Sequence, residues 1–454
     1  MNDFAWRALG AGSTVAAYAA LCASIYLRER RRTAEAARDS AALSAGSDEA
    51  PVLVLFASQT GQAESIAWQT ARQLSAANTP ARVMELNALD GAALAIASRA
   101  LFIASTYGEG DAPDGASVFL ERMMNSSPSL PSLSYAVLAL GDRQYANFCG
   151  FGRALDEWLQ AAGARREFDR IEVDNNDPAA LAAWHAHWGD APGAAGDAEG
   201  AVFTPWRLVS REHLNPGSAG WPVFHLGLVP QAGGALPYWA SGDLAQVIVA
   251  SDPKRPRDYS IASVHADGEL QLLVRQERHP DGTLGAASGL LTSTLGVGDT
   301  VALRVREHRG FRLDGNESRP LVLVGNGTGI AGLRAHLRTR AAMGRHDNWL
   351  VFGERQAAHD FLYRKEIEAW QAGGVLKRLD MVFSRDQADR FYVQHRLLQS
   401  ADTLLQWLHD GAAIYVCGSL QGMASGVDAA LRQIAGEAQI TELAASGRYR
   451  RDVY

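Results

Sequence analysis

The stretch GNGTGI, residues 325–330, follows the apolar run of residues 320–324 and precedes a segment with a helical pattern. A glycine-rich turn between a strand and a helix often holds a phosphate, because backbone N–H groups and the positive end of the helix dipole converge there. Taken alone the motif is weak, since a plain tight turn can have the same composition. The rest of the chain has to decide between these two interpretations.

Composition limits the classes of function. The chain has 454 residues, of which 47% are hydrophobic, which is enough for two or three domains with separate cores. A formal net charge of −7 argues against nucleic acid as the main partner. Three cysteines, Cys22, Cys149 and Cys417, form no CxxC pair, which indicates a reducing compartment and no structural metal site.

The N-terminus predicts a membrane anchor. Residues 8–27 carry no charge and are about as long as a membrane-spanning helix, and Arg28 and Arg30 to Arg32 follow at once. Basic residues stay on the cytoplasmic side, so we expect a single-pass inner-membrane protein with a cytoplasmic catalytic part. A buried helix and a cleaved signal peptide are the alternatives, although a signal peptide carries its charge before the apolar core. The prediction is an anchor over residues 1–32 and a tether over residues 33–49.

Beyond the tether, strand and helix patterns alternate, then give way to short strands, then alternate again. Residues 50–189 predict a parallel sheet covered by helices, with strands at 52–57, 99–105 and 135–140 and helices at 64–76 and 152–162. A linker is expected over residues 190–202, where glycine, alanine, proline and acidic residues accumulate.

The remaining chain predicts a barrel and a second α/β unit. Residues 203–318 predict a small antiparallel barrel with strands at 244–250, 259–263, 270–275 and 299–305. Residues 319–454 predict the second α/β unit, with strands at 321–324, 350–352, 378–383 and 413–417.

In the first α/β unit, the loop ASQTGQAES at residues 57–65 lies between a strand and a helix. It offers hydroxyl and amide donors and a glycine, from Ser58, Gln59, Thr60, Gly61, Gln62 and Ala63. The loop has no lysine, which excludes the phosphate loop of nucleotide-hydrolysing enzymes. A bound phosphomonoester and a well-capped helix start both remain open on this evidence.

Two further loops follow predicted strand ends in the same unit. They read STYGEGDAPDGA at residues 105–116 and LGDRQYANFCGFG at residues 140–152. Ligands of open α/β sheets bind at such strand ends. Each loop carries a tyrosine, Tyr107 or Tyr145, that could stack on a flat ring, although both could also be core or surface residues.

In matching order, these three loops resemble those of flavodoxin-type FMN domains. The resemblance implies FMN, with its phosphate on residues 58–63 and its ring between Tyr107 and Tyr145. The other residues that it assigns to FMN are Ser105, Thr106, Gly108, Leu140, Gly141, Asp142 and Phe148.

The barrel carries RDYSIAS at residues 257–263, where strand alternation places Arg257, Tyr259 and Ile261 on one face. Arg257 could clamp a pyrophosphate while Tyr259 packs on a flavin. GAAS at residues 285–288 opens a short helix with backbone donors. Together the two motifs resemble the FAD-binding pair of the ferredoxin–NADP reductase family. The resemblance assigns FAD to Arg257, Tyr259, Ser260, Gly285, Ala286, Ala287 and Ser288.

The same family resolves the opening motif. GNGTGI is similar to its nicotinamide-nucleotide loop, which implies that Gly327, Thr328 and Gly329 hold the pyrophosphate. Asn326 and Gly332 stand where the family has prolines, so a more flexible loop is expected.

SRDQADRFYVQ, residues 384–394, follows a predicted strand. Ser384, Arg385 and Arg390 suit a dianionic 2′-phosphate, although a solvated basic turn has the same composition. The resemblance implies NADPH at this segment, with Tyr392 and Gln394 as further contacts.

The chain ends in RYRRDVY, and a buried-looking strand ends in IYVCG at residues 414–418. A cysteine at a strand end is often a small core residue. The resemblance instead places Ser260, Cys417 and Asp452 around the site of hydride transfer, and Tyr454 as a lid on the FAD ring. These four residues form the predicted catalytic set.

Over residues 51–454 the chain resembles the diflavin reductases, which include sulfite reductase flavoprotein subunits and NADPH–haemoprotein reductases. The resemblance implies electron flow from NADPH through FAD and FMN to an external acceptor. That acceptor could be a haemoprotein, a sulfite reductase-like partner or a ferric-siderophore-type membrane protein. The alternative is a membrane-tethered carrier or docking module that does not oxidise NADPH.

Two features qualify the resemblance. Relatives insert a helical domain before RDYS, but residues 241–260 are too few to contain it. The orientation of FMN relative to FAD is therefore left open. Residues 51–200 hold eighteen acidic residues against nine arginines and no lysine, a net charge of −9. Glu109, Asp111 and Asp114 flank the expected FMN ring, where they could steer a basic partner or simply keep the domain soluble.

Overall fold

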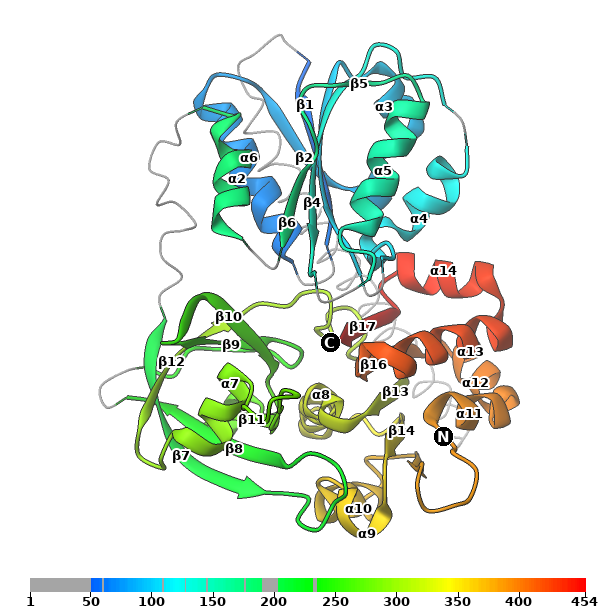
Figure 1. The fold of residues 1–454 in the computed structure, drawn as a ribbon. Coiled ribbons are helices and arrows are strands. Elements are labelled where there is room, and N and C mark those ends of the chain that lie inside the picture. The colour runs from blue at the N-terminus through cyan, green and yellow to red at the C-terminus, as the bar shows by residue number, and fades with distance from the viewer. Residues whose placement is uncertain are drawn as a thin grey trace, which may run out of the picture.

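The computed structural model describes residues 50–189 and 203–454, except for positions 59–60, 108–109, 127, 144–145, 175–176 and 232–234. The side chains of residues 114, 254, 255, 420 and 421 are also outside this description. Figure 1 shows three parts, which we call the first unit (residues 50–189), the barrel unit (203–318) and the third unit (319–454). Their order is the predicted one of α/β, barrel and α/β.

The first unit is built on a parallel sheet of order β2-β1-β3-β4-β5, with β6 beside β4. Its strands are β1 (Val52–Ala57), β2 (Ala81–Glu85), β3 (Arg99–Ser105), β4 (Ser134–Gly141), β5 (Arg165–Arg166) and β6 (Ile171–Asp174). The central strands are apolar on both faces, because each face is covered by helices.

The helices of the first unit lie on both sides of this sheet (Figure 1). They are α2 (Gln62–Ala76), α3 (Gly91–Ile96), α4 (Ser117–Phe119), α5 (Gly150–Ala161) and α6 (Pro178–Ala186), with short turns η1 (Leu86–Ala88), η2 (Asp114–Ala116) and η3 (Leu120–Met124). One core contains Leu53 and Leu55 under α3, α4 and α5. The other contains Val52 and Val54 under α2 and α6. Alternate residues of β1 therefore belong to opposite cores, as its pleat requires.

The barrel unit is an antiparallel sheet of order β10-β9-β12-β7-β8-β11 around one apolar core. Its strands are β7 (Thr204–His213), β8 (Val223–Pro230), β9 (Leu244–Val249), β10 (Asp252–Ser260), β11 (Leu270–Arg275) and β12 (Thr300–Arg306). Its helical pieces are η4 (His265–Asp267), α7 (Ala286–Gly289) and η5 (Leu290–Thr294). A bridge between Ile261 and Leu272 links the two edges and curls the sheet towards closure.

The third unit has a parallel sheet of order β15-β14-β13-β16-β17. Its strands are β13 (Leu321–Asn326), β14 (Asn348–Glu354), β15 (Arg378–Phe383), β16 (Ala413–Gly418) and β17 (Tyr449–Val453). Its helices are α8 (Ile330–Ala342), α9 (Ala357–Asp360), α10 (Arg364–Ala372), α11 (Val393–Gln399), α12 (Ala401–His409), α13 (Ser425–Ala435) and α14 (Glu437–Ala445), with turns η6 (Gly327–Gly329) and η7 (Leu420–Ala424). Two cores, one on each face, hold these helices to the sheet.

Strand order places a topological switch point at the carboxyl end of β13. The chain moves from β13 to β14 on one side and returns to β16 on the other, so the connections at the carboxyl end of β13 diverge. Ligands of open α/β sheets bind at such a switch point. The glycine-rich turn η6 lies there.

A tight hairpin connects β9 to β10, where Val249 pairs with Asp252. This is the place at which the family resemblance puts a helical connecting domain. The structure has only Ala250 and Ser251 between the two strands. The orientation of the first unit therefore depends on other contacts.

The prediction of a membrane-spanning helix, and with it the single-pass inner-membrane localisation, is wrong for the structure as described. Among the described residues, no helix combines the length and the apolar character needed to cross a bilayer. Residues 8–27, which carried the prediction, lie outside the described residues. That segment is rich in alanine and glycine, which bury little apolar surface despite the absence of charge. The fold class of the described residues is thus two α/β units and a barrel.

Candidate functional site

A buried carboxylate near the end of the chain collects the predicted catalytic side chains. The hydroxyl of Ser260 donates to Asp452 Oδ2 over 2.7 Å, and the thiol of Cys417 donates to the same oxygen over 3.7 Å. All three side chains are buried. Cys417 and Asp452 face each other across β16 and β17, while Ser260 comes from the end of β10 in the barrel unit. The cluster therefore exists only where the barrel and third units meet.

The Cys417 thiol acts as a donor in this cluster. Burial and the neighbouring Asp452 carboxylate raise the pKa of Cys417 well above that of a free thiol. The group remains protonated at neutral pH, which excludes a thiolate nucleophile. A carboxylate held by two neutral donors in a water-poor site can stabilise positive charge that develops beside it.

His308 is a further member of the cluster that no sequence pattern marks. Its Nδ1 lies 4.0 Å from Asp452 Oδ1, and its ring is 1% exposed. Asp243 holds the loop of His308, since it accepts from the backbone N–H of His308 over 2.9 Å and from the guanidinium of Arg312 over 2.7 Å. A single histidine between exposed charges has no local signal, so only the fold reveals it.

The glycine-rich turn presents backbone to its surroundings because side chains do not fit. Gly327 has a φ of +57°, and a Cβ there would lie 2.3 Å from Nη2 of Arg275. A Cβ on Gly329 would lie 2.0 Å from the carbonyl oxygen of Cys417. A turn that exposes backbone N–H groups before α8 fits the pyrophosphate of a nicotinamide nucleotide.

Asn326 ties this turn to the next loop. Its Oδ1 accepts a hydrogen bond from the backbone N–H of Ser419 over 2.9 Å. The residue that replaces the family's proline thus adds a restraint between β13 and β16. The greater flexibility expected from the sequence finds no support in this contact.

Tyr454 lies over the glycine-rich turn. Its backbone N–H donates to the carbonyl of Gly418 over 3.1 Å, and its hydroxyl donates to Oγ1 of Thr328 over 3.2 Å. The residue is 52% exposed. A terminal aromatic ring held by one side-chain hydrogen bond fits a removable lid.

The segment predicted to bind the 2′-phosphate lies beside the ends of β14 and β15. The backbone N–H groups of Ser384 and Arg385 donate to the carbonyls of Glu354 and Arg355, each over 2.8 Å. Ser384 is buried, whereas Arg385 and Arg390 are exposed. These positions leave both guanidinium groups available to an anion in solution.

Tyr392 and Gln394 lie at the start of α11, which follows this segment in the chain. Tyr392 precedes the helix and is 37% exposed. The side-chain oxygen Oε1 of Gln394 is buried and has no hydrogen-bond partner among the described residues. A buried polar atom without a partner is costly, so it marks a place where a ligand donor would fit.

Glu354 and Arg275 are two further residues at the glycine-rich turn that the sequence did not reveal. Glu354 ends β14, and its Oε1 lies 3.7 Å from Nη2 of Arg275 at the end of β11. Burial raises the pKa of Glu354 to about 7, an effect that Arg275 partly offsets. A carboxyl group beside a phosphate-binding turn therefore changes its charge near neutral pH.

The FAD residues predicted in the barrel unit lie on β10 and at α7. Nη2 of Arg257 lies 3.2 Å from Oδ2 of Asp252, and burial raises the pKa of Tyr259. Gly285 precedes α7, which begins with Ala286 and Ala287. The hydroxyl of Ser288 accepts from the backbone N–H of Glu277 over 3.1 Å, so Ser288 fastens α7 to the barrel.

The loops predicted to bind FMN lie at the carboxyl ends of β1, β3 and β4. Gly61 has a φ of +83° and begins α2, which opens with Gln62 and Ala63. Hydroxyl oxygens of Ser58 and Thr106 are buried and have no hydrogen-bond partner among the described residues. Two orphaned hydroxyls just after the neighbouring strands β1 and β3 fit the phosphate and chain of FMN.

The other FMN residues frame the same edge. Ser105 ends β3, and Leu140 and Gly141 end β4 just before Asp142. Phe148 is buried, and Arg143 stacks on its ring with Cζ 4.7 Å from the centroid. Four of the predicted residues, Gln59, Thr60, Gly108 and Tyr145, lie outside the described residues.

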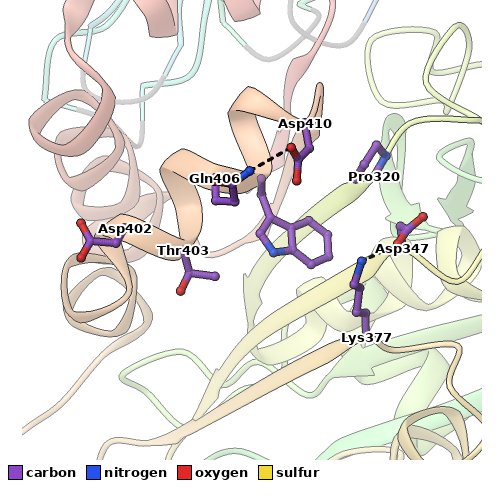
Figure 2. Close-up of a pocket in the computed structure, with 8 residues that line it drawn as sticks. Pro320, Asp347, Lys377, Asp402, Thr403, Gln406 and Asp410 are labelled. Atoms are coloured by element: carbon purple, nitrogen blue, oxygen red, sulfur yellow. Dashed lines mark hydrogen bonds and ion pairs between the residues drawn. The ribbon is translucent and has the colours of Figure 1, made fainter.

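A cavity of about 460 Å³ lies at the opposite edge of the third sheet. Figure 2 shows Lys377 directed towards Asp347 and Gln406 towards Asp410. Pro320 lines it just before β13, whereas the glycine-rich turn comes after that strand. The cavity is therefore separate from the nucleotide site.

Comparisons with known proteins identify the two α/β units and the family of the chain. Residues 54–188 match the flavodoxin family model, and residues 323–429 match that of the oxidoreductase NAD-binding domain. The chain is 31% identical to the sulfite reductase [NADPH] flavoprotein alpha-component of Neisseria meningitidis, over 89% of each protein. It is 29% identical to the protein of the same name from Vibrio cholerae, over 91% of this chain and 89% of the relative. The alignment with the Vibrio cholerae protein spans 548 positions, which is more than the 454 residues of this chain. That relative therefore has insertions compared with this chain.

Proposed function

The chain belongs to the family of NADPH-dependent diflavin reductases that includes sulfite reductase flavoprotein components, and we propose that it reduces an external haem-containing protein. The protein is a flavoprotein oxidoreductase that uses FMN, FAD and NADPH. The alternative of a carrier without NADPH oxidation does not hold for an enzyme of this class. We further propose the acceptor, the site residues and the boundaries of the three units.

One observation carries the proposed site of hydride transfer. Ser260 and Cys417 both donate a hydrogen bond to the same oxygen of Asp452. When bound, NADPH supplies a hydride, FAD accepts it, and FMN supplies single electrons to the acceptor. Ser260 and Cys417 hold the Asp452 carboxylate in place, and burial excludes water around it. The carboxylate can then stabilise positive charge on a neighbouring ring without reorganising.

Other residues select and place the nucleotide. Arg385 and Arg390 attract the 2′-phosphate, and Gly327 and Gly329 leave the backbone of η6 free to approach the pyrophosphate. Tyr454 covers this turn through its hydrogen bond to Thr328 and would have to move aside for a bound nicotinamide. These roles require no movement of the sheet.

The acceptor is proposed to be a protein with a basic surface. Residues 51–200 have a net charge of −9, and Asp111 in the loop after β3 is exposed. Charge of one sign around an exit site raises the encounter rate with a partner of the opposite sign. A haemoprotein is favoured because the relatives are components of sulfite reductase by name.

The test uses the full chain in two preparations, one with both flavins and one depleted of FMN. Both should oxidise NADPH with ferricyanide. Reduction of cytochrome c, a basic haemoprotein, should require FMN and return when FMN is added. An equal cytochrome rate without FMN would place the electron exit outside the first unit.

A further inference from the structure

Among the described residues, a cation–π pair joins the first unit to the third unit. Cζ of Arg451 in β17 lies 4.6 Å from the ring centroid of Tyr107, which follows β3. Tyr107 is 9% exposed and the Arg451 side chain 11% exposed, so the pair is shielded from solvent. Figure 1 shows β17 beneath the strand ends of the first unit.

Arg451 is fixed from its own side of the contact. Its Cζ lies 5.4 Å from the ring centroid of Tyr449, and its Nη1 lies 3.8 Å from Oδ1 of Asp428 in α13. Asp428 is held in turn by the hydroxyl of Tyr449, which donates to it over 2.9 Å. The guanidinium therefore presents a preset flat face to Tyr107.

One strand carries this contact and the hydride-transfer cluster. Neighbouring residues of a strand point to opposite faces, so Arg451 and Asp452 are directed to different sides of β17. Asp452 accepts from Ser260 and Cys417, while Arg451 meets the loop proposed to hold the FMN ring. A shift of the first unit away from β17 would separate the two sites.

Further contacts lie around this pair. The helix α14 packs against α4 and η2 of the first unit. Glu64 in α2 lies in the field of Arg309 and Glu307, from the loop that follows β12. Since β9 and β10 are joined by a tight hairpin, no inserted domain between these strands can supply the orientation.

We propose that Arg451 is a positioning residue that holds the first unit over the hydride-transfer cluster by stacking on Tyr107. The inference rests on the proposed function, because it assumes that the Tyr107 loop holds FMN. A shielded cation–π contact shifts an equilibrium by about 5- to 30-fold. The equilibrium concerned is between a compact and a separated arrangement of the first and third units.

The test compares the full chain, with both flavins bound, and its Arg451→Ala and Arg451→Lys variants. Small-angle X-ray scattering measures the fraction of compact molecules. We expect Arg451→Ala to shift the equilibrium about 5- to 30-fold towards the separated form. Arg451→Lys keeps the charge but loses the planar face, so it should lie between Arg451→Ala and the unchanged protein.

Arg364→Ala is the matched control, because Arg364 stacks on Phe361 within the third unit with Cζ 5.2 Å from the centroid. It should leave the scattering unchanged. In stopped-flow experiments, Arg451→Ala should slow FMN reduction by NADPH while FAD reduction keeps its rate. Circular dichroism shows whether each variant is folded. If Arg451→Ala does not fold, the comparison is made with Arg451→Lys instead.

Unchanged scattering and unchanged FMN reduction in a folded Arg451 variant would overturn the inference. So would an equal effect of Arg364→Ala. The scattering result does not depend on the acceptor. Failure of cytochrome c reduction in the unchanged protein would therefore count against the proposed function and leave the test of Arg451 intact.

Discussion

At the scale of single residues, we expect charge near the glycine-rich turn to determine how the nucleotide is held. Arg385 and Arg390 are exposed cations of the proposed site, whereas Glu354 is an acid beside the glycine-rich turn whose side chain is 9% exposed. Arg275 lies between Glu354 and Gly327 and partly balances the acid. These charges act on NADPH in opposite directions.

Arg385→Ala should weaken the use of NADPH far more than that of NADH. A charge-assisted contact to phosphate contributes about 1.5–3 kcal/mol, which corresponds to about a 10- to 150-fold loss in kcat/KM. Steady-state kinetics with both coenzymes measures the difference, and Arg385→Lys should retain part of the preference. Equal losses for NADPH and NADH would contradict the assignment.

Glu354→Gln should remove a pH dependence. Burial raises the pKa of Glu354 to about 7 from an ordinary 4.5. The folded protein therefore holds this proton more tightly than the unfolded chain, so the free energy of unfolding is highest below pH 4.5 and falls as the pH rises through 7. Above pH 7 the carboxylate also repels the phosphates of NADPH. We expect KM for NADPH to rise from pH 6 to pH 8 in the unchanged protein and to rise less in the variant.

The same substitution should change stability. The raised pKa corresponds to roughly 3 kcal/mol of unfolding free energy lost between pH 4.5 and pH 8, and Glu354→Gln should not show this loss. Urea unfolding at several pH values measures it. Glu368→Gln, at a half-exposed ion pair with Arg364, is the control. Identical pH profiles for Glu354→Gln and the unchanged protein would rule out a titrating Glu354.

At the scale of elements, β17 combines several roles through its alternation. Arg451 faces the first unit, Asp452 faces the cluster, and Tyr454 continues the strand over the glycine-rich turn. Pairing with β16 places Asp452 opposite Cys417. A slip of one residue in this pairing would exchange the two faces.

Deletion of Tyr454 should relax the choice of coenzyme. In the proposed site the ring competes with the nicotinamide for one face of the flavin, and such aromatic contacts contribute about 0.5–1.5 kcal/mol. We expect the ratio of NADPH to NADH efficiency to fall about 2- to 10-fold. Tyr454→Phe keeps the ring but loses the hydrogen bond to Thr328, so it should retain most of the preference. An unchanged ratio after deletion would argue against a lid.

At the scale of the whole molecule, we expect the negative charge of the first unit to attract a basic partner protein. Reduction of cytochrome c should slow steeply as salt is added, because screening shortens the range of attraction to about 10 Å at 0.1 M. Ferricyanide reduction should not slow in this way. Neutralising Glu109, Asp111 and Asp114 together should lower the cytochrome rate and its salt dependence.

The control for charge uses acids of the third unit. Glu368→Gln and Asp402→Asn alter net charge away from the first unit. They should leave the cytochrome rate nearly unchanged. A cytochrome rate that depends neither on salt nor on the three acids would place the docking surface elsewhere.

The sequence alone predicted the order of two α/β units around a barrel, while the roles of the loops stay predictions. Strands β1, β3 and β15 have the predicted bounds, because buried parallel strands are continuous apolar runs with a clear beginning and end. The strand predicted at residues 259–263 was misplaced, since β10 runs from Asp252 to Ser260. Asp252 pairs with Val249, the register then shifts, and pairing with β9 resumes only at Arg257, so the charged and proline-containing residues 253–256 form an irregularity that no local propensity predicts.

Family resemblance grouped Ser260, Cys417 and Asp452, but only the tertiary structure decided how their atoms meet and which other side chains join them. His308, Arg275, Glu354 and Arg451 have ordinary sequence neighbours and no spacing that marks them. Ser260 is 192 positions from the carboxylate that it binds. A motif of consecutive residues is legible in sequence because the backbone alone fixes its geometry, whereas a cluster drawn from three strands depends on register and packing that no local pattern encodes.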